Sequence, residues 1–180
     1  QWHLDRQWKF IQKLAREQGI LLFGDLPFYV SRDSADVWSS RSLFSVLPGG
    51  ELAFQSGVPP DYFSQTGQLW GTPVYRWEIH QKTHFNWWRR RLARHMQQVD
   101  LLRLDHFRAL ESYWAIPGNK TTAQEGSWQP SPGFDLLKSL RNDFGGHLPL
   151  VAEDLGVITP EVEELRDQFS LPGMKILQFG

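Results

Sequence analysis

Two carboxylates stand out in the sequence, because each directly follows a short apolar run. Asp105 ends the run Leu-Leu-Arg-Leu-Asp, and Glu153 ends Leu-Val-Ala-Glu. Such runs are typical of buried strands, and the carboxyl ends of parallel strands carry the functional groups of many α/β enzymes. A pair of carboxylates in that place is what glycoside chemistry uses, one as nucleophile and one as acid/base. The pattern therefore predicts a sugar-processing site.

Arg103 supports this interpretation, since it lies two residues before Asp105 and therefore on the same side of the expected strand. Its guanidinium can then keep the Asp105 carboxylate ionised, as a nucleophile requires. Glu153 has no such neighbour and is expected to hold a proton more readily, as an acid does. A purely structural ion pair remains the alternative. Asp154 should point away from Glu153 along the strand, and we interpret it as structural.

Asp25 is a third acidic residue that follows an apolar run, Ile20-Leu21-Leu22-Phe23. If all three runs are parallel strands, Asp25, Asp105 and Glu153 lie along one edge of the sheet. Each of them could instead cap the turn that follows, as acidic residues often do. Three in equivalent places favour a shared function.

The elements that must position these residues alternate between helix and strand. The first helix is expected from the apolar stripe Leu4, Trp8, Ile11 and Leu14, and Gly19 is expected to end it as a left-handed C-cap. Further helices are expected at 79–96, at 134–144, and after Thr159 as N-cap with Pro160 at the first helical position. Strands are expected at 20–23, 101–104, 150–153 and 174–177.

About four consecutive helix–strand units predict a parallel α/β sheet, and specifically part of a (β/α)8 TIM barrel. A doubly wound open sheet is the alternative. Because eight strands need about 250 residues, we expect residues 1–180 to be the central portion of a larger catalytic barrel. Gln1 is not an initiator methionine, which leads us to expect a natural N-terminus upstream.

Residues 39–77 form a long, Pro- and Gly-rich segment, which we interpret as a lid-like loop or subdomain inserted over the cleft. Tyr62 and Trp70 offer flat faces for sugar rings, and Asp61 and Gln68 offer hydrogen bonds to hydroxyl groups. An ordinary packed surface loop would also contain aromatic residues, so both interpretations stay open here.

Composition limits the classes of partner. A net charge of -1 argues against a nucleic-acid or anionic-membrane protein. The absence of cysteine excludes disulfides and thiolate-bound zinc and fits a cytoplasmic protein. No apolar run reaches the roughly 18 residues of a membrane span. His80 and His84 have the i,i+4 spacing of a metal pair but lack the Glu of a zinc-protease motif, so we expect solvated histidines and no metal.

Four segments together resemble the amylomaltases, the 4-alpha-glucanotransferases or disproportionating enzymes of the α-amylase clan. They are 24–31, 57–73, 103–108 and 152–156, and the resemblance extends over nearly the whole chain. It implies a (β/α)8-barrel enzyme that cuts α-1,4-glucans or maltooligosaccharides and transfers the piece to the 4-hydroxyl of an acceptor sugar. The resemblance also implies a double displacement that retains the configuration of the anomeric carbon and needs no cofactor or metal.

The resemblance also implies roles for single residues. Asp105 matches the nucleophile and Glu153 the acid/base, while Arg103 and Asp25 match positions beside them. Trp70 matches an aromatic platform on a loop over the cleft. Four further residues are expected to contact the substrate: Asp61, Tyr62, Gln68 and His106. The role of His106 stays open.

A third catalytic Asp is expected beyond Gly180, so the isolated chain should be inactive. The alternatives are an α-glucan hydrolase of the same clan and a non-catalytic glucan-binding fragment.

Overall fold

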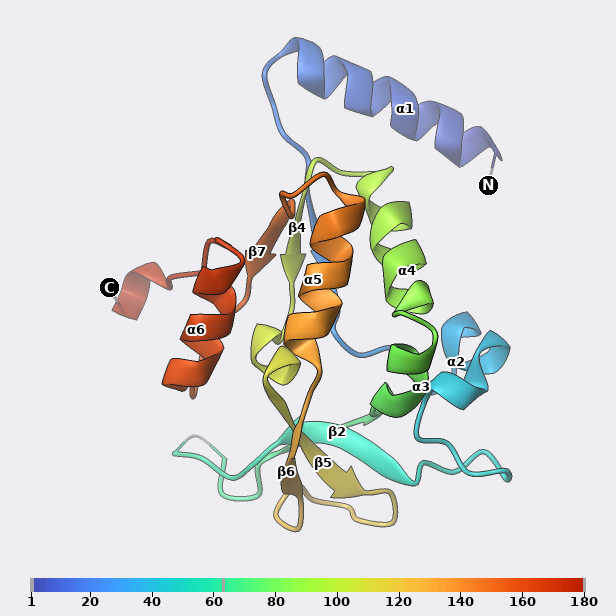
Figure 1. The fold of residues 1–180 in the computed structure, drawn as a ribbon, viewed down its shortest axis with the longest axis vertical. Coiled ribbons are helices and arrows are strands. Elements are labelled where there is room, and N and C mark those ends of the chain that lie inside the picture. The colour runs from blue at the N-terminus through green and yellow to red at the C-terminus, as the bar shows by residue number, and fades with distance from the viewer. Residues whose placement is uncertain (1, 63, 180) are drawn as a thin grey trace. The chain divides into compact units, whose positions relative to one another are not determined.

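The computed structural model describes residues 2–62 and 64–179, and the chain falls into two compact units. Unit 1 consists of residues 1–27, 86–107 and 137–180, and unit 2 of residues 28–85 and 108–136. Figure 1 shows the elements of both.

Unit 1 is built on a three-stranded parallel sheet in the order β1-β4-β7. The strands are β1 (Phe23–Leu26), β4 (Leu101–Leu104) and β7 (Leu150–Ala152). Their apolar side chains form the core, with Leu26, Leu102, Leu104, Leu150 and Ala152 all at most 3% exposed. The predicted parallel sheet of an α/β fold is thus confirmed.

The first strand begins later than the sequence indicated. The carboxylate of Asp100 accepts a hydrogen bond from the N–H of Leu22, and the carbonyl of Leu22 accepts from Asp100 and Leu101. The regular ladder starts only at Phe23, opposite Leu101. As a result Asp25 lies within β1, directly opposite Arg103 of β4, instead of beyond the end of the strand.

Helices accompany this sheet at the predicted places after residue 130. They are α5 (Gly133–Asp143) and α6 (Pro160–Gln168), which has Thr159 at its N-cap and Pro160 at its start. Leu137 and Leu140 of α5 and Val162 and Leu165 of α6 are buried. Proline fits the first helical position because its missing N–H has no partner there in any helix.

The single helix expected at 79–96 is wrong, because the structure has two. They are α3 (Trp77–Lys82) in unit 2 and α4 (Asn86–Met96) in unit 1. Between them His84 and Phe85 have φ angles of 50° and 55°, a left-handed backbone that ends a right-handed helix. The apolar spacing misled us because Phe85 is buried in the break itself.

The fourth strand, expected at 174–177, is also wrong. The N–H of Met174 donates to Oδ1 of Asp154 at 2.7 Å, so it is used by a side chain instead of a neighbouring strand. The carbonyl of Pro172 accepts from Ala152 at 2.8 Å, without a ladder. Residues 177–179 form the 3-10 turn η3 (Leu177–Phe179).

Helix α1 (Trp2–Glu17) ends as predicted at Gly19, whose φ is 69°. The N–H of Ile20 donates to Ala15 and that of Gly19 to Arg16, which is the Schellman arrangement of a helix end. Glycine adopts this left-handed conformation without the steric cost of a Cβ.

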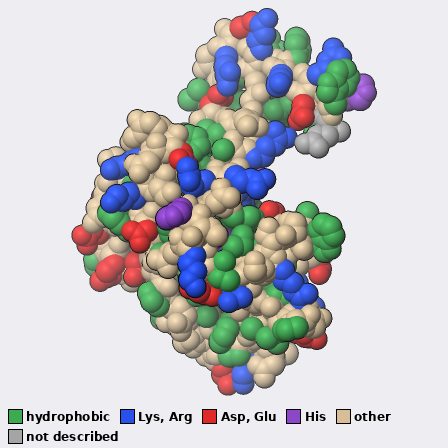
Figure 2. Space-filling model, turned by 45° about the vertical axis from the view of Figure 1, so that its right-hand side comes forward, with side chains coloured by type: hydrophobic (Ala, Val, Ile, Leu, Met, Phe, Trp, Pro, Cys, Tyr) green, Lys and Arg blue, Asp and Glu red, His purple; other side chains and the backbone are tan. Residues whose placement is uncertain are grey.

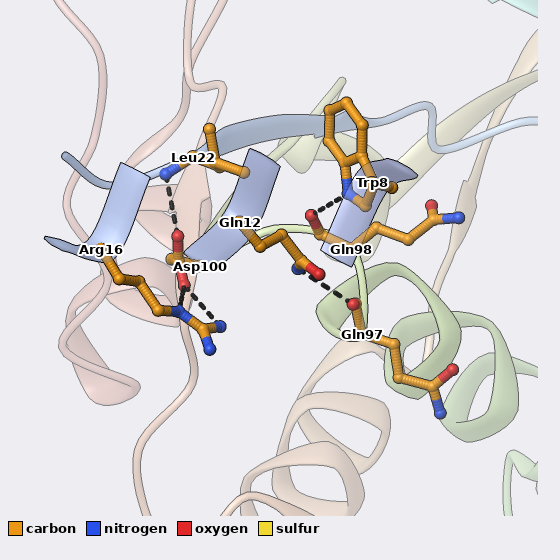
Figure 3. Close-up of polar contacts among 7 residues, drawn as sticks. All are labelled: Trp8, Gln12, Arg16, Leu22, Gln97, Gln98 and Asp100. Atoms are coloured by element: carbon orange, nitrogen blue, oxygen red, sulfur yellow. Dashed lines mark hydrogen bonds and ion pairs between the residues drawn. The ribbon is translucent and has the colours of Figure 1, made fainter. Parts of the chain in front are cut away.

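The side of α1 that packs differs from the predicted apolar stripe. Leu4, Ile11 and Leu14 are 44–62% exposed. The helix is instead held by polar contacts, in which Trp8 donates to the carbonyl of Gln98, Gln12 donates to that of Gln97, and Arg16 pairs with Asp100 (Figure 3). Of the four stripe residues, Trp8 takes part in these contacts, because they follow the side of the helix on which residues 8, 12 and 16 lie one turn apart.

Both basic and acidic side chains lie on the face shown in Figure 2, in agreement with the net charge of -1. In the described part of the chain, no helix combines the length and the apolar character that crossing a bilayer would take.

Unit 2 contains a four-stranded antiparallel sheet that the sequence did not predict, in the order β3-β2-β5-β6. The strands are β2 (Phe54–Val58), β3 (Gln68–Pro73), β5 (Ser112–Pro117) and β6 (Ser127–Pro130). The 39–77 segment supplies only the first two, and residues 112–130 supply the others. The short helix α2 (Ala35–Ser39) and the 3-10 turns η1 (Arg41–Leu43) and η2 (Phe107–Leu110) complete the elements.

An aromatic cluster forms the core of unit 2. Tyr29 stacks on Tyr75 with centroids 5.9 Å apart, and Phe28 meets Tyr75 edge-on at 5.5 Å. Trp77 packs at 5.0 Å from Tyr75. Large buried rings dominate the stability of such a core, so they give the neighbouring sheet a firm support.

Candidate active site

Arg103 joins two carboxylates in unit 1. Its Nε donates to Oδ1 of Asp25 at 2.8 Å and its Nη2 to Oδ2 at 3.2 Å, a two-point contact between neighbouring strands. Nη2 also lies 3.0 Å from Oδ1 of Asp105. The sequence placed Arg103 beside Asp105, but it gave no sign of the closer Asp25 partner, because that contact depends on the register of β1 and β4.

The arginine is the more enclosed member of this group. Its side chain is 27% exposed, against 54% for Asp25 and 41% for Asp105. The hydrogen bonds to Asp25, with the negative charges of Asp105 and Asp25, raise the pKa of Arg103. The guanidinium therefore stays charged at any pH of interest and provides a fixed positive centre, while the aspartates remain accessible to a ligand.

Glu153 follows β7 and is aligned with Asp105, since the ladder pairs Leu104 with Ala152. Its carboxylate accepts a hydrogen bond from the N–H of His106 at 2.8 Å and from that of Leu155 at 3.3 Å. Burial raises the pKa of Glu153, and the negative charge of Asp105 adds to this effect. The two N–H donors and Arg103 act in the opposite direction without cancelling it.

His106 contributes to the site through its backbone. Its φ of 49° is unusual for a residue with a side chain, and this conformation aims its N–H at Oε2 of Glu153. The next N–H, of Phe107, donates to the Glu153 carbonyl at 3.0 Å. No sequence motif could have shown this, because the donor is a main-chain group.

Asp105 and Glu153 have different electrostatic environments. Asp105 lies 3.0 Å from the guanidinium of Arg103, whereas burial raises the pKa of Glu153. Neighbouring carboxyl groups in contrasting environments are what an enzyme needs to combine a nucleophile with an acid.

The other predicted binding residues belong to unit 2. Trp70, on β3, is 38% exposed, and its indole N–H donates to Oε1 of Gln68 at 3.1 Å. Asp61 accepts the N–H of Ser64 at 2.7 Å and so closes a turn, and Tyr62 is 95% exposed. The structure thus brings Trp70 and Gln68 together and assigns Asp61 a local hydrogen bond.

Asp154 has the structural contacts expected of it. Its side chain is 6% exposed, pairs with Nη1 of Arg166 on α6 at 2.5 Å, and accepts the N–H of Met174. It therefore ties α6 and the chain after it to the end of β7.

We expect Asp154→Asn to destabilise the fold by about 1–3 kcal/mol, because it removes one charge of a largely buried ion pair. Thermal unfolding measures the effect. Asp167→Asn is the matched control, since Asp167 contacts the same arginine but is 66% exposed. Equal destabilisation by both changes would contradict this explanation.

His80 and His84 lie in different environments. His80 is fully buried, and burial lowers its pKa to about 4. The expectation of a solvated histidine is therefore wrong for His80, which lies in the aromatic core 5.3 Å from Tyr75, and right for the exposed His84. Among residues 2–62 and 64–179, no three His, Asp or Glu side chains are grouped so as to hold a metal ion.

Comparison with known proteins agrees with the resemblance seen in the four sequence segments. The model of the 4-alpha-glucanotransferase family matches residues 1–180. A 4-alpha-glucanotransferase from Synechocystis is 53% identical over 97% of this chain and 35% of its own length, and one from Thermus thermophilus is 49% identical over 100% and 36%.

Among solved structures, the amylomaltase from Streptococcus agalactiae in complex with acarbose superposes with a TM-score of 0.93. It is 42% identical, and the match covers 97% of this chain and 35% of that one. The chain thus spans about a third of the length of the curated relatives it matches. The chain belongs to the 4-alpha-glucanotransferase family.

Proposed function

We propose that this chain is part of the catalytic (β/α)8 barrel of a 4-alpha-glucanotransferase, which transfers segments of α-1,4-glucans to the 4-hydroxyl of an acceptor sugar. The observation that carries the proposal is the contrast between Asp105, paired with Arg103 at 3.0 Å, and Glu153, whose pKa is raised by burial. Family membership supplies the substrate class, and the S. agalactiae relative with acarbose supports a carbohydrate ligand.

The mechanism that we propose is a retaining double displacement. Asp105 attacks the anomeric carbon while Glu153 donates its proton to the departing glycosidic oxygen. Glu153, now ionised, then removes the proton from the acceptor hydroxyl, which displaces Asp105 from the sugar. Arg103, which is itself held by Asp25 at 2.8 Å, contacts Asp105 at 3.0 Å and so orients its carboxylate for attack.

The test is the chain length of the products that the full-length enzyme forms from pure maltotriose. Glucose together with maltooligosaccharides longer than maltotriose would establish transfer. Glucose and maltose alone would instead identify an α-glucan hydrolase of the same clan, and binding of maltotriose without turnover would identify a glucan-binding protein.

Trp70 is proposed to hold the acceptor sugar against its exposed ring, so that the sugar competes with water. Trp70→Ala should lower the ratio of transfer to hydrolysis by about fivefold, because stacking on an aromatic ring contributes about 1 kcal/mol. Labelled maltotriose and the count of free reducing ends give both rates. Trp38→Ala is the control, since Trp38 is 87% exposed on α2. An unchanged ratio in Trp70→Ala would rule out this role.

A further inference from the structure

A cavity of about 350 Å³ lies within unit 2, at the antiparallel sheet and the start of α3. Its size is at the lower end of the range for small-ligand sites. Six of the residues that line it carry the argument: Phe54, Tyr113, Ala115 and Gln129 from the sheet, and Arg76 and Glu78 from the chain around the start of α3.

Strand register places the sheet residues of the cavity on one face. Tyr113 pairs with Gln129, and Ala115, two residues on, points the same way. Ser56 pairs with Ala115, so Phe54 also faces this side.

Trp70 shares that face. Val58 pairs with Gln68, and Gln68 and Trp70 are two residues apart on β3, while Val58, Ser56 and Phe54 alternate along β2. The sheet therefore presents the proposed sugar platform and the cavity on the same side.

The polar groups of the cavity have hydrogen-bonding capacity left over. The Tyr113 hydroxyl makes no hydrogen bond to any residue that the structure describes, although its side chain is half-buried. Gln129 donates its amide N–H to Ser127 at 3.0 Å, which leaves its carbonyl oxygen as an acceptor. The Tyr113 hydroxyl is not among the fully buried polar atoms that lack a partner, so it is free to exchange water for a ligand hydroxyl.

Charge and shape narrow the class of ligand. Arg76 and Glu78 form an ion pair at 3.0 Å, so the cavity has no net charge to attract an anion or a cation. Phe54 is 45% exposed and offers an apolar face beside these polar groups. An apolar surface next to neutral donors and acceptors suits a sugar ring, which has apolar C–H faces and a hydroxyl edge.

We propose that this cavity binds a glucosyl unit of an α-glucan, as a sugar subsite of unit 2 in addition to Trp70. The proposal rests on the proposed function for its ligand class. In it, the Tyr113 hydroxyl and the Gln129 carbonyl bond sugar hydroxyls, Glu78 accepts a further one, and Phe54 contacts the ring.

Two alanine methyl groups provide separate reporters for the test. Ala115 is 4% exposed and lines the cavity, whereas Ala152 ends β7 just before Glu153 in unit 1. The full-length enzyme, carrying Asp105→Asn to prevent turnover, is labelled with ¹³C-methyl alanine and titrated with maltose. We expect both signals to shift with saturation, and glycerol at the same hydroxyl concentration to leave Ala115 unmoved.

Variants then assign the Ala115 signal. Tyr113→Phe removes only the hydroxyl and should raise the maltose Kd reported by Ala115 about 5- to 10-fold, the effect of one hydrogen bond. Glu78→Gln should raise it in the same direction. Glu164→Gln is the matched control, because Glu164 lies on the exposed side of α6 and bonds only Gln168.

The outcomes separate the two proposals. A shift of Ala152 without a shift of Ala115 would overturn the cavity and leave the proposed function standing. An Ala115 response that glycerol reproduces, or that ignores Tyr113→Phe, would also overturn it. If neither methyl group responds to maltose, the proposed function fails together with the cavity.

Discussion

Asp105→Asn in the full-length enzyme is expected to lower the turnover of maltotriose by at least about 10⁴-fold, the range seen when a nucleophile is removed. The amide is nearly the same size as the carboxylate but cannot form the glycosyl ester. Because Asp105 also balances the charge of Arg103 at 3.0 Å, the change leaves Asp25 as the remaining carboxylate partner of the guanidinium. Rates on maltotriose, measured with product-length analysis, check the prediction.

A donor with a better leaving group sharpens this test. α-Maltosyl fluoride needs no proton from Glu153 to release fluoride, but it still needs a nucleophile, so Asp105→Asn should remain inactive on it. Asp154→Asn is the matched control, since it is the same chemical change one residue from Glu153 in a side chain that contacts Arg166 and Met174. Substantial turnover of the fluoride by Asp105→Asn would show that another residue is the nucleophile.

The parts of this site that could be predicted from the sequence depend on local spacing. The runs before Asp105 and Glu153 indicated β4 and β7 because a short apolar run between turns has few alternatives. The pairing of Arg103 with Asp105 also followed from spacing, as residues two apart on a strand share a side.

The parts that could not be predicted depend on contacts between distant segments. The Asp25–Arg103 pair joins residues 78 positions apart, and it exists only in one register of β1 against β4. The antiparallel sheet of unit 2 was missed for the same reason, since β2 pairs with β5 across about sixty residues that include the helices α3 and α4 and the parallel strand β4. Backbone donors such as His106 leave no trace in residue types.

Helical periodicity also gave wrong predictions where a break in the helix or a set of polar contacts decides which side chains are buried. The 79–96 pattern continues through Phe85 although the backbone there is left-handed. In α1, Gln12 is buried and Leu14 is 49% exposed, the reverse of what hydrophobicity predicts. Propensity and pattern give way to tertiary contacts in such places.

Glu153→Gln is the second large effect, and we expect it to lower maltotriose turnover by about 10³-fold, within the usual range for a general acid. The amide cannot donate a proton to the glycosidic oxygen. With α-maltosyl fluoride as donor the loss in the first step should be much smaller, because fluoride leaves without protonation. This rescue by the leaving group distinguishes an acid from a nucleophile, and its absence would contradict the role of Glu153.

The pH dependence follows from the direction of the shift. An acid must hold its proton, so kcat/KM falls as the pH rises through the pKa of Glu153. Because burial raises that pKa, the fall should occur at higher pH than for an ordinary glutamate. Opening the site to water, or supplying a further N–H donor to the carboxylate, would move the fall to lower pH. In Glu153→Gln, assayed with the fluoride donor, this limb of the profile should vanish.

The same shift predicts how Glu153 affects the stability of the fold. A carboxyl whose pKa is higher in the folded than in the unfolded protein makes its full contribution below the unfolded pKa, and that contribution is lost as the pH rises through the folded pKa. Glutamine is neutral throughout, so Glu153→Gln should unfold at a higher temperature than the parent at pH 7, and the gap should close below pH about 4. Burial of this carboxyl group serves catalysis at a cost in stability, so its replacement by an amide gives a less active but more stable variant. A lower unfolding temperature at pH 7 would instead show that the hydrogen bonds from His106 and Leu155 outweigh the burial of the charge.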